Sequence, residues 1–182
     1  MRKIWMILLL AVCLLTGCNK DRTSLEDTDS GYREDISPKS LVEAVASELS
    51  DEYWADAVLE QEILDDWYGI SAEMYEEFYG QTPMISANVD ALIVVKAKEE
   101  HLEDVQNALD TYRESMIQDT LQYPMNIPKI QASQINTFGN YVCFVQLGGS
   151  MEGIMDDDEA AIEACRKMNE RALSVIEGEL KQ

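Results

Sequence analysis

The run Ala91–Ala97 is the feature that most constrains what this chain can fold into. It reads Ala-Leu-Ile-Val-Val-Lys-Ala, so a β-strand formed by it carries apolar side chains on both faces. Such a strand is stable where both faces of its sheet are covered. The sequence therefore predicts a central strand in a sheet against which helices pack. Lys96, near the end of the run, can extend its ammonium group to water.

A hairpin is the second strand signal, because Gly139-Asn140 separates two strand-like runs within residues 132–147. Gly-Asn between such runs is typical of a two-residue turn. This turn pairs Thr137 with Val142 and Ile135 with Phe144 on one face, and Asn136 with Cys143 and Gln134 with Val145 on the other. The first run is more polar and predicts an edge strand, whereas Tyr141–Leu147 is expected further inside the sheet.

Most of the other apolar residues recur at helical spacing. Ser37 before Pro38 is typical of an N-cap and the first residue of a helix. Four further helices are expected: one from about Val58 that stops at Gly69, a short one capped by Ser71 that carries Met74, Tyr75, Phe78 and Tyr79, a long one from Glu99 to about Gln122, and a last one opened by Asp156–Glu159. Tyr123-Pro124 and Ile127-Pro128 predict an extended connector after the long helix. Together these signals predict one compact α+β domain over residues 38–182, with a mostly antiparallel sheet.

The N-terminus reads as a targeting segment. Arg2 and Lys3 precede the apolar run Ile4–Leu15, which at about a dozen residues is shorter than the ~20 that a membrane-spanning helix needs. The following Leu-Thr-Gly-Cys resembles the lipobox of bacterial lipoprotein signals. That resemblance implies cleavage between Gly17 and Cys18 and lipid attachment to the Cys18 thiol, and two acyl chains suffice for stable anchoring. The alternative is an ordinary signal peptide that ends near a cysteine.

The N-terminal signal predicts three parts and a location for the chain. Residues 1–17 are the signal, 18–37 the lipidated cysteine with a polar linker, and 38–182 the domain. We expect the domain on the extracytoplasmic face of the cell membrane, held there through Cys18. The chain has 14 Lys and Arg against 35 Asp and Glu, a net charge of −21. Because nucleic acids are bound through basic patches, this charge excludes a nucleic-acid partner.

Candidate ligand-binding residues lie in the stretch 51–80, which is dense in aromatic and acidic side chains. Trp54, Trp67 and Tyr68 are candidates for a surface that binds a sugar or a peptide. The alternative is that helices pack these aromatic faces against the sheet. The acids at the start of the last helix complement its dipole, and a metal cluster there is a second interpretation.

Few residues suited to catalysis are available. His101 is the only histidine and is expected to be exposed at the start of the long helix. No nucleophile elbow, zinc-protease motif, phosphate loop or dinucleotide fingerprint occurs, so we assign no catalytic residue, metal or cofactor. Cys143 and Cys165 remain after the signal and the lipid anchor, and they are expected either as buried thiols or as a disulfide.

Several motifs between Asp66 and Leu147 occur together: Tyr68-Gly69-Ile70, the strand Ala91–Ala97 with Lys96, Arg113, Tyr123-Pro124 and Gly139-Asn140-Tyr141-Val142. In this order they resemble an uncharacterised domain-of-unknown-function family found in lipoproteins of Gram-positive bacteria. The resemblance implies an anchored extracytoplasmic domain and brings no established activity. The helix at 156–182 extends past the expected end of that pattern.

These observations favour a non-enzymatic binding or accessory module at the cell surface. Its partner would be a protein, a peptide or an envelope polymer. The alternative is an envelope polymer hydrolase that uses an Asp/Glu pair, because two suitably spaced carboxylates are enough for glycoside hydrolysis.

Overall fold

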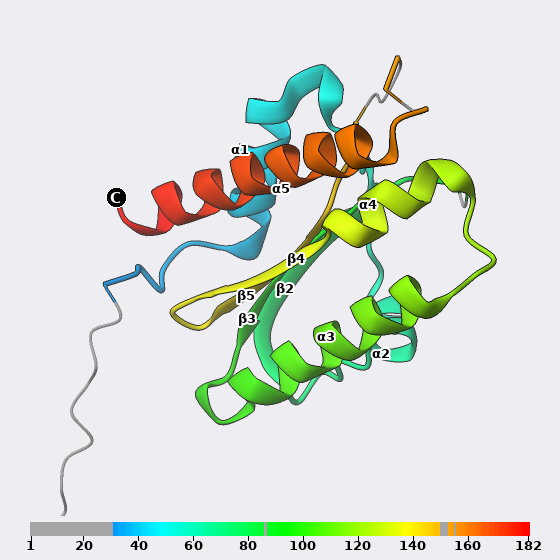
Figure 1. The fold of residues 1–182 in the computed structure, drawn as a ribbon. Coiled ribbons are helices and arrows are strands. Elements are labelled where there is room, and N and C mark those ends of the chain that lie inside the picture. Colours follow the sequence, from blue (N-terminus) through cyan, green and yellow to red (C-terminus); the bar gives the residue numbers. More distant parts are fainter. Residues whose placement is uncertain (1–30, 86, 150–152, 155) are drawn as a thin grey trace, which may run out of the picture.

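The computed structural model describes residues 31–85, 87–149, 153–154 and 156–182 (Figure 1). The expected signal, its cleavage site and Cys18 lie outside these residues. Within the described part of the chain, no helix is both long enough and apolar enough to cross a membrane. The fold is a single compact α+β domain, as the sequence predicts.

Within the described residues, five antiparallel strands form one sheet in the order β1-β2-β3-β5-β4. Their bounds are β1 Ala57–Val58, β2 Tyr75–Thr82, β3 Ala91–Ala97, β4 Gln134–Phe138 and β5 Tyr141–Gln146. The run 91–97 is the central strand, and the 132–147 hairpin has the predicted register at all four pairs. The more polar β4 lies at the edge, with β5 beside β3, also as predicted.

Helices cover both faces of this sheet, which is what two apolar faces of β3 require. The helices are α1 Pro38–Leu49, α2 Gln61–Tyr68, α3 Leu102–Gln118, α4 Ile127–Ala132 and α5 Asp158–Leu180. Figure 1 shows α1 and α5 on one side of the sheet and α2 and α3 on the other. The side chains of β3 divide accordingly: Leu92 and Val94 pack in the core under α1 and α5, and Ile93 and Val95 in the core under α2 and α3.

The helix ends follow the local sequence. Ser37 caps α1 by accepting a hydrogen bond from the Ser40 amide at 3.1 Å, and Pro38 is its first residue. Asp157 caps α5 in the same way, with the Ala160 amide at 3.0 Å from Asp157 Oδ1. A carboxylate that caps a helix has a structural role, and the described residues contain no group of three or more His, Cys, Asp or Glu suited to a metal ion.

The predicted short helix after Ser71 is wrong, because Tyr75, Phe78 and Tyr79 lie in β2 and Met74 directly precedes that strand. The register of β2 against β3 shifts between Tyr75 and Glu77. This bulge places Tyr75 and Phe78, three residues apart, in the same core with their rings at 5.2 Å. Tyr79 packs in the other core. A bulged strand can therefore place residues three positions apart on the same face, as a helix does.

The predicted extended connector is also wrong. Pro124 begins a short 3-10 helix over Pro124–Asn126, and Pro128 lies in the first turn of α4. Proline is tolerated in a first turn, since its missing N–H has no partner there in any case. The long helix, predicted from Glu99 to about Gln122, is shorter: a 3-10 turn at Glu99–His101 precedes α3, which ends at Gln118.

The two cysteines of the domain are buried and are not joined to each other. Cys143 lies in β5 beneath α1 and α5, and Cys165 packs in a small cluster with Ala132 and Ala161. Burial raises the pKa of the Cys143 thiol to about 12 and that of Cys165 to about 11. Both thiols therefore stay protonated at neutral pH and behave as small apolar groups.

Candidate functional site

A cavity of about 650 Å³ opens between α2, the C-terminal half of α3 and the connection from β2 to β3. Its lining is mainly apolar and includes Leu59, Ile63, Trp67, Tyr112 and Met116. Cavities of this size with an apolar lining and a few polar groups are the usual form of small-ligand and side-chain binding sites. We take it as the candidate functional site.

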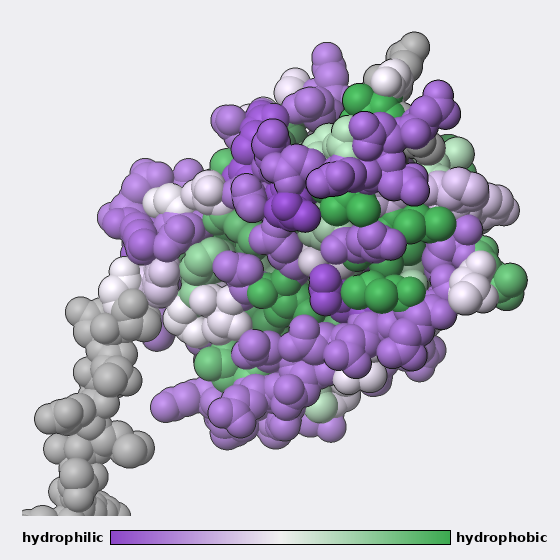
Figure 2. All heavy atoms as spheres, viewed as in Figure 1, coloured by the Kyte–Doolittle hydropathy of each residue, from purple (hydrophilic) through white to green (hydrophobic). Residues whose placement is uncertain are grey.

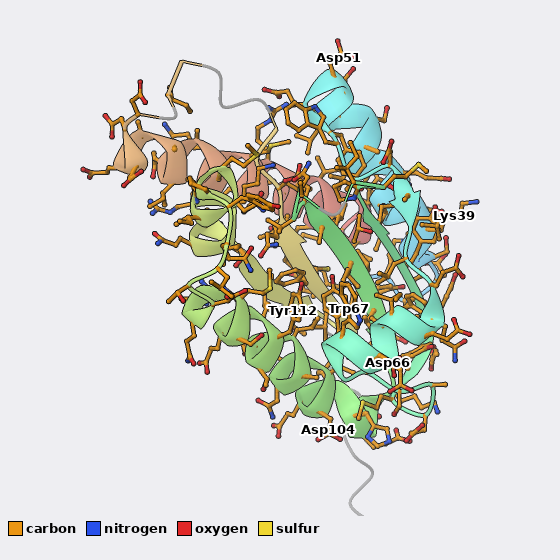
Figure 3. The ribbon with its side chains drawn as sticks, turned by 90° about the vertical axis from the view of Figure 1, so that its right-hand side faces the viewer. Lys39, Asp51, Asp66, Trp67, Asp104 and Tyr112 are labelled. Carbon is orange, nitrogen blue, oxygen red and sulfur yellow. The ribbon has the colours of Figure 1, made fainter. Side chains whose placement is uncertain are left out.

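Aromatic side chains from α2 and α3 form one wall of the cavity. The rings of Tyr68 and Tyr112 are 4.2 Å apart, and both contact Phe144 of β5 edge-on, at 6.2 and 5.7 Å. Figure 3 shows Trp67 and Tyr112 in the space between these two helices and the sheet. Burial raises the pKa of both tyrosines, so their hydroxyl groups remain protonated and polar.

The end of α2 determines how Trp67 and Tyr68 are presented. Consecutive residues of a helix point about 100° apart, so one can face the core while the next faces solvent. Tyr68 is buried, whereas the Trp67 side chain is 66% exposed at the cavity entrance. Gly69 ends the helix in the left-handed conformation, at φ 71°, and its amide donates to the Asp65 carbonyl. The chain then turns back so that Ile70 enters the core.

Asp90 lines the opposite, polar side of the cavity and pairs with a buried lysine. Lys129 Nζ lies 2.7 Å from Asp90 Oδ1 and 2.9 Å from Asn88 Oδ1, and both charged side chains are almost fully buried. Burial raises the pKa of the Asp90 carboxyl, and the ammonium group of Lys129 acts against that rise. The stem of Lys129 lies so close to Gly148 that a Cβ there would come within 2.6 Å of it.

Further polar contacts hold the β2–β3 connection in place at the edge of the cavity. Asn126 donates through Nδ2 to the Ala87 carbonyl at 3.0 Å, and Gln146 through Nε2 to the Val89 carbonyl at 2.6 Å. Asn88 Oδ1 accepts from the Asp90 amide at 3.1 Å as well as from Lys129. The connection is therefore tied to both α4 and β5, so this side of the cavity is formed before any ligand arrives.

The three candidate residues from the sequence do not form one surface. Trp67 and Tyr68 line the cavity, but Trp54 does not. The Trp54 ring lies over the ammonium group of Lys129 at 5.4 Å, and its indole N–H donates to the Asp51 carbonyl. Trp54 thus has a packing role beside the polar cluster. His101, at the end of the 3-10 turn, lies with Nδ1 2.9 Å from Asp104 Oδ2, where the carboxylate accepts a hydrogen bond from the protonated ring nitrogen.

Sequence reasoning missed Asp90, Lys129 and Tyr112 as parts of the site. Tyr112 occurs in the apolar stripe of the long helix, a pattern that indicates packing alone. A lysine in the apolar context of residues 127–132 is the one available signal for a buried charge. Its partner Asp90 lies 39 positions away in the sequence, and only the fold brings the two together.

The charged residues on the cavity wall are acidic. Among the residues that the structure describes, Glu60 and Asp90 line the cavity, and no Lys, Arg or His does. The sequence around it has the same bias, because residues 40–95 contain 13 Asp and Glu and no basic residue. Arg113, next to Tyr112 in α3, donates through Nε to the Ser133 carbonyl and hydroxyl oxygens. Because Lys129 pairs with Asp90, the negative charge at the cavity comes from Glu60 and from the acidic stretch of sequence around it.

The family comparison covers the whole cavity. A family model described as "Domain of unknown function (DUF4358)" matches residues 50–147, which extend from the end of α1 to the end of β5. Every lining residue falls in this range, whereas α1 and α5 lie outside it. No curated protein and no solved structure matches the chain. Because the matched range is more than half of its sequence, the chain belongs to the DUF4358 family of domains of unknown function.

Proposed function

We propose that this protein is a membrane-anchored extracytoplasmic lipoprotein whose domain is a non-enzymatic binding module, with the cavity beside Trp67 as its ligand site. The observation that carries the proposal is the cavity itself. It is about 650 Å³ in volume, mainly apolar, and bounded by buried aromatic side chains and by a connection that is tied down on both sides. A preformed apolar cavity binds its ligand with little cost of ordering the protein.

The burial of Asp90 and its pairing with Lys129 favour binding over catalysis in this cavity. The alternative, an envelope polymer hydrolase with an Asp/Glu pair, would use Glu60 and Asp90 if it acted in this cavity, since these are the acids among the described residues that line it. The carboxylate of Asp90 is buried and paired with Lys129 at 2.7 Å. A general acid or base must reach its substrate. The binding module is therefore the better-supported function.

Binding in the cavity can be tested with a neutral apolar dye such as Nile red. Ser115 lines the cavity from α3 and its side chain is exposed, so Ser115→Trp adds a large ring there without disturbing the core. The wild-type protein should bind the dye and enhance its fluorescence, and Ser115→Trp should weaken binding about tenfold or more. Glu114→Trp is the matched control, because Glu114 is exposed on the same helix and does not line the cavity. Equal binding by all three proteins, or none by the wild type, would contradict the ligand site.

The anchor requires a separate test. Expressed in a bacterium that processes lipoproteins, the full chain should incorporate labelled fatty acid and partition into detergent. Cys18→Ser should abolish both, whereas Cys13→Ser, a change inside the proposed signal, should abolish neither. Protease added to intact cells should degrade the domain if it is extracytoplasmic. Fatty-acid labelling that survives Cys18→Ser would contradict the proposed attachment.

A further inference from the structure

Most of the strongly exposed apolar side chains of the described residues line the cavity or lie in stretches of the chain that reach it. Ten large hydrophobic residues are strongly exposed in the described part of the chain, and nine of them either line the cavity or lie in the two stretches 84–85 and 117–127. Met84 and Gln122 connect these stretches to the cavity, because both line it. Figure 2 shows apolar side chains at the surface between α3 and α4. We call these nine residues the apolar rim: Val58, Trp67, Met84, Ile85, Ile117, Leu121, Tyr123, Met125 and Ile127.

The apolar rim is held in position by the fold. The Asn126–Ala87 hydrogen bond ties the 124–127 segment to the β2–β3 connection, and Met84 and Gln122 line the same cavity, so the two stretches approach each other there. Leu121 is 90% exposed although its amide donates to Asp119 Oδ1 at 2.9 Å, and Met84 is 82% exposed. Isolated exposed hydrophobic residues need no explanation, but a contiguous group marks an interaction surface.

Three possible occupants conflict with the charge or size of this surface. A second copy of the chain would bring two acidic surfaces together, because residues 40–95 and 114–128 contain no basic residue. A membrane with anionic headgroups is repelled for the same reason. A small ligand would fill the cavity but leave Ile85 and Leu121, which do not line it, exposed to water.

We propose that the apolar rim and the cavity together bind a polypeptide segment that carries both apolar and basic side chains. This inference rests on the proposed function, because it uses the same cavity and names the class of its ligand. One apolar side chain of the segment enters the cavity beside Trp67, and others cover the rim. Basic side chains of the segment lie near Glu60, near Asp65 and Asp66 beside Trp67, and near Asp119 at the end of α3. The sequence around these acids, residues 40–95 and 114–128, contains no basic residue that would repel a cationic group of the segment.

Three synthetic peptides of about 14 residues serve as probes. The first contains Leu and Lys, the second has Glu in place of every Lys, and the third has Ser in place of every Leu. Their binding to the full chain in mild detergent is measured by fluorescence anisotropy at 0.15 M salt, where the Debye length of about 8 Å suppresses attraction by distant charges. The Leu/Lys peptide should bind at least tenfold more tightly than either of the other two.

Variants locate the binding surface. Leu121→Ser and Trp67→Ala should each weaken binding of the Leu/Lys peptide about tenfold, whereas Trp54→Ala, an indole outside the rim, should not. Glu60→Gln should weaken it severalfold, and Glu62→Gln, which removes a carboxylate of α2 that does not line the cavity, should have a smaller effect. Circular dichroism of every variant serves as the control that the fold is retained.

The outcomes separate this inference from the function on which it rests. Equal binding of the Lys and Glu peptides, unchanged binding in Leu121→Ser and Trp67→Ala, or no binding of any peptide would each overturn the inference. A dimer that forms through the rim, detected by sedimentation and lost in Leu121→Ser, would also overturn it. Nile red binding that Ser115→Trp blocks would leave the ligand cavity standing in all of these cases. If the wild-type protein did not bind the dye, the cavity would not be a ligand site and the proposed function would fail as well.

Discussion

Lys129 is the residue through which α4, the β2–β3 connection and the end of β5 contact one another. Its ammonium group pairs with Asp90 and Asn88, its stem packs on Gly148, and the Trp54 ring covers it. A buried ion pair contributes little net stability in comparison with an apolar replacement of both partners. Removal of a single partner is different, because it leaves a charge in the interior without compensation.

Lys129→Met should therefore lower the free energy of unfolding at neutral pH by about 3–5 kcal/mol, because Asp90 loses its buried partner. Urea denaturation followed by circular dichroism measures this change. Lys39→Met is the control, because Lys39 is an exposed residue of α1 whose pairing with Glu43 is worth at most ~0.5 kcal/mol. Equal losses of stability in the two variants would show that Asp90 does not depend on Lys129 for compensation of its buried charge.

The loss in Lys129→Met should also depend on pH. Burial already raises the pKa of Asp90, and removal of the ammonium group raises it further. The folded variant then keeps its proton to a higher pH than the unfolded chain, in which Asp titrates near 3.9. Its deficit relative to the wild type should thus be smallest below that pH and grow as the pH rises toward the folded pKa. Urea titrations from pH 3.5 to 8 test this, and a deficit that shrinks as the pH rises would contradict it.

Among the elements, α2 ends sharply, directly after Trp67 and Tyr68. The stop is Gly69, which adopts φ 71°, a conformation that costs other L-residues about 1–2 kcal/mol. A Cβ at this position would meet only Ala108 Cβ, at 3.9 Å, so the cost of a side chain there is one of backbone conformation. The position at which α2 ends thus depends on the backbone conformation of the single residue Gly69.

Gly69→Ala should destabilise the domain by about 1 kcal/mol, whereas Gly178→Ala should stabilise it by about 0.5–1 kcal/mol. Gly178 lies in α5 with no atom near its would-be Cβ and no positive φ, so alanine there only favours the helix. Thermal unfolding of the two variants should give melting temperatures that move in opposite directions. Shifts of the same sign would show that the conformation of Gly69 is not what ends α2.

The elements also show which sequence signals predict structure. The β3 run and the Gly139-Asn140 turn predict the observed strands correctly, because an apolar run with two apolar faces and a two-residue turn each permit one arrangement. Two predictions, a helix where β2 lies and an extended connector where α4 lies, are wrong because one sequence pattern fits two structures. A bulge in β2 gives strand residues a helical spacing, and proline begins a helix as readily as it ends one. The pattern alone does not distinguish these alternatives.

At the scale of the whole molecule, the family match and the folded unit have different boundaries. Residues 50–147 contain the sheet, α2, α3 and the cavity, but one face of the sheet packs against α1 and α5. Leu92, Val94, Cys143 and Val145 of that face are fully buried in the presence of these helices. Without them, this apolar face would be open to water.

A chain consisting of residues 50–147 alone should thus fail to fold, although it includes the entire cavity. It should aggregate or bind the dye ANS non-specifically, as expected for a chain that exposes a whole sheet face. Residues 31–182 should instead unfold in a single cooperative transition. Calorimetry and dye fluorescence of the two chains provide the comparison. Cooperative unfolding of 50–147 would show that α1 and α5 are accessory to the fold.

The candidate site was less predictable than the fold, because its parts are far apart in the sequence. Trp67 and Tyr68 stood out as aromatic residues in an acidic stretch, but Tyr112 and Asp90 join them only through the packing of α3 and of the β2–β3 connection. Local spacing predicts the faces of single elements. It carries no information on which faces of elements that are far apart in the sequence meet in the fold.

The place where the chain enters the domain gives it an orientation. The Arg33 amide donates to the Leu180 carbonyl at 2.8 Å, and the Tyr32 hydroxyl to Glu177, so residues 31–36 lie beside the C-terminal end of α5. Figure 1 shows this end on the opposite side of the molecule from the connection between α3 and α4. A tether that starts at Cys18 would pull at one pole of the domain and leave the other pole, with the apolar rim, pointing outward. A pull by a bound partner would then run along the axis between the two poles, loading the contacts of Tyr32 and Arg33 with α5 first.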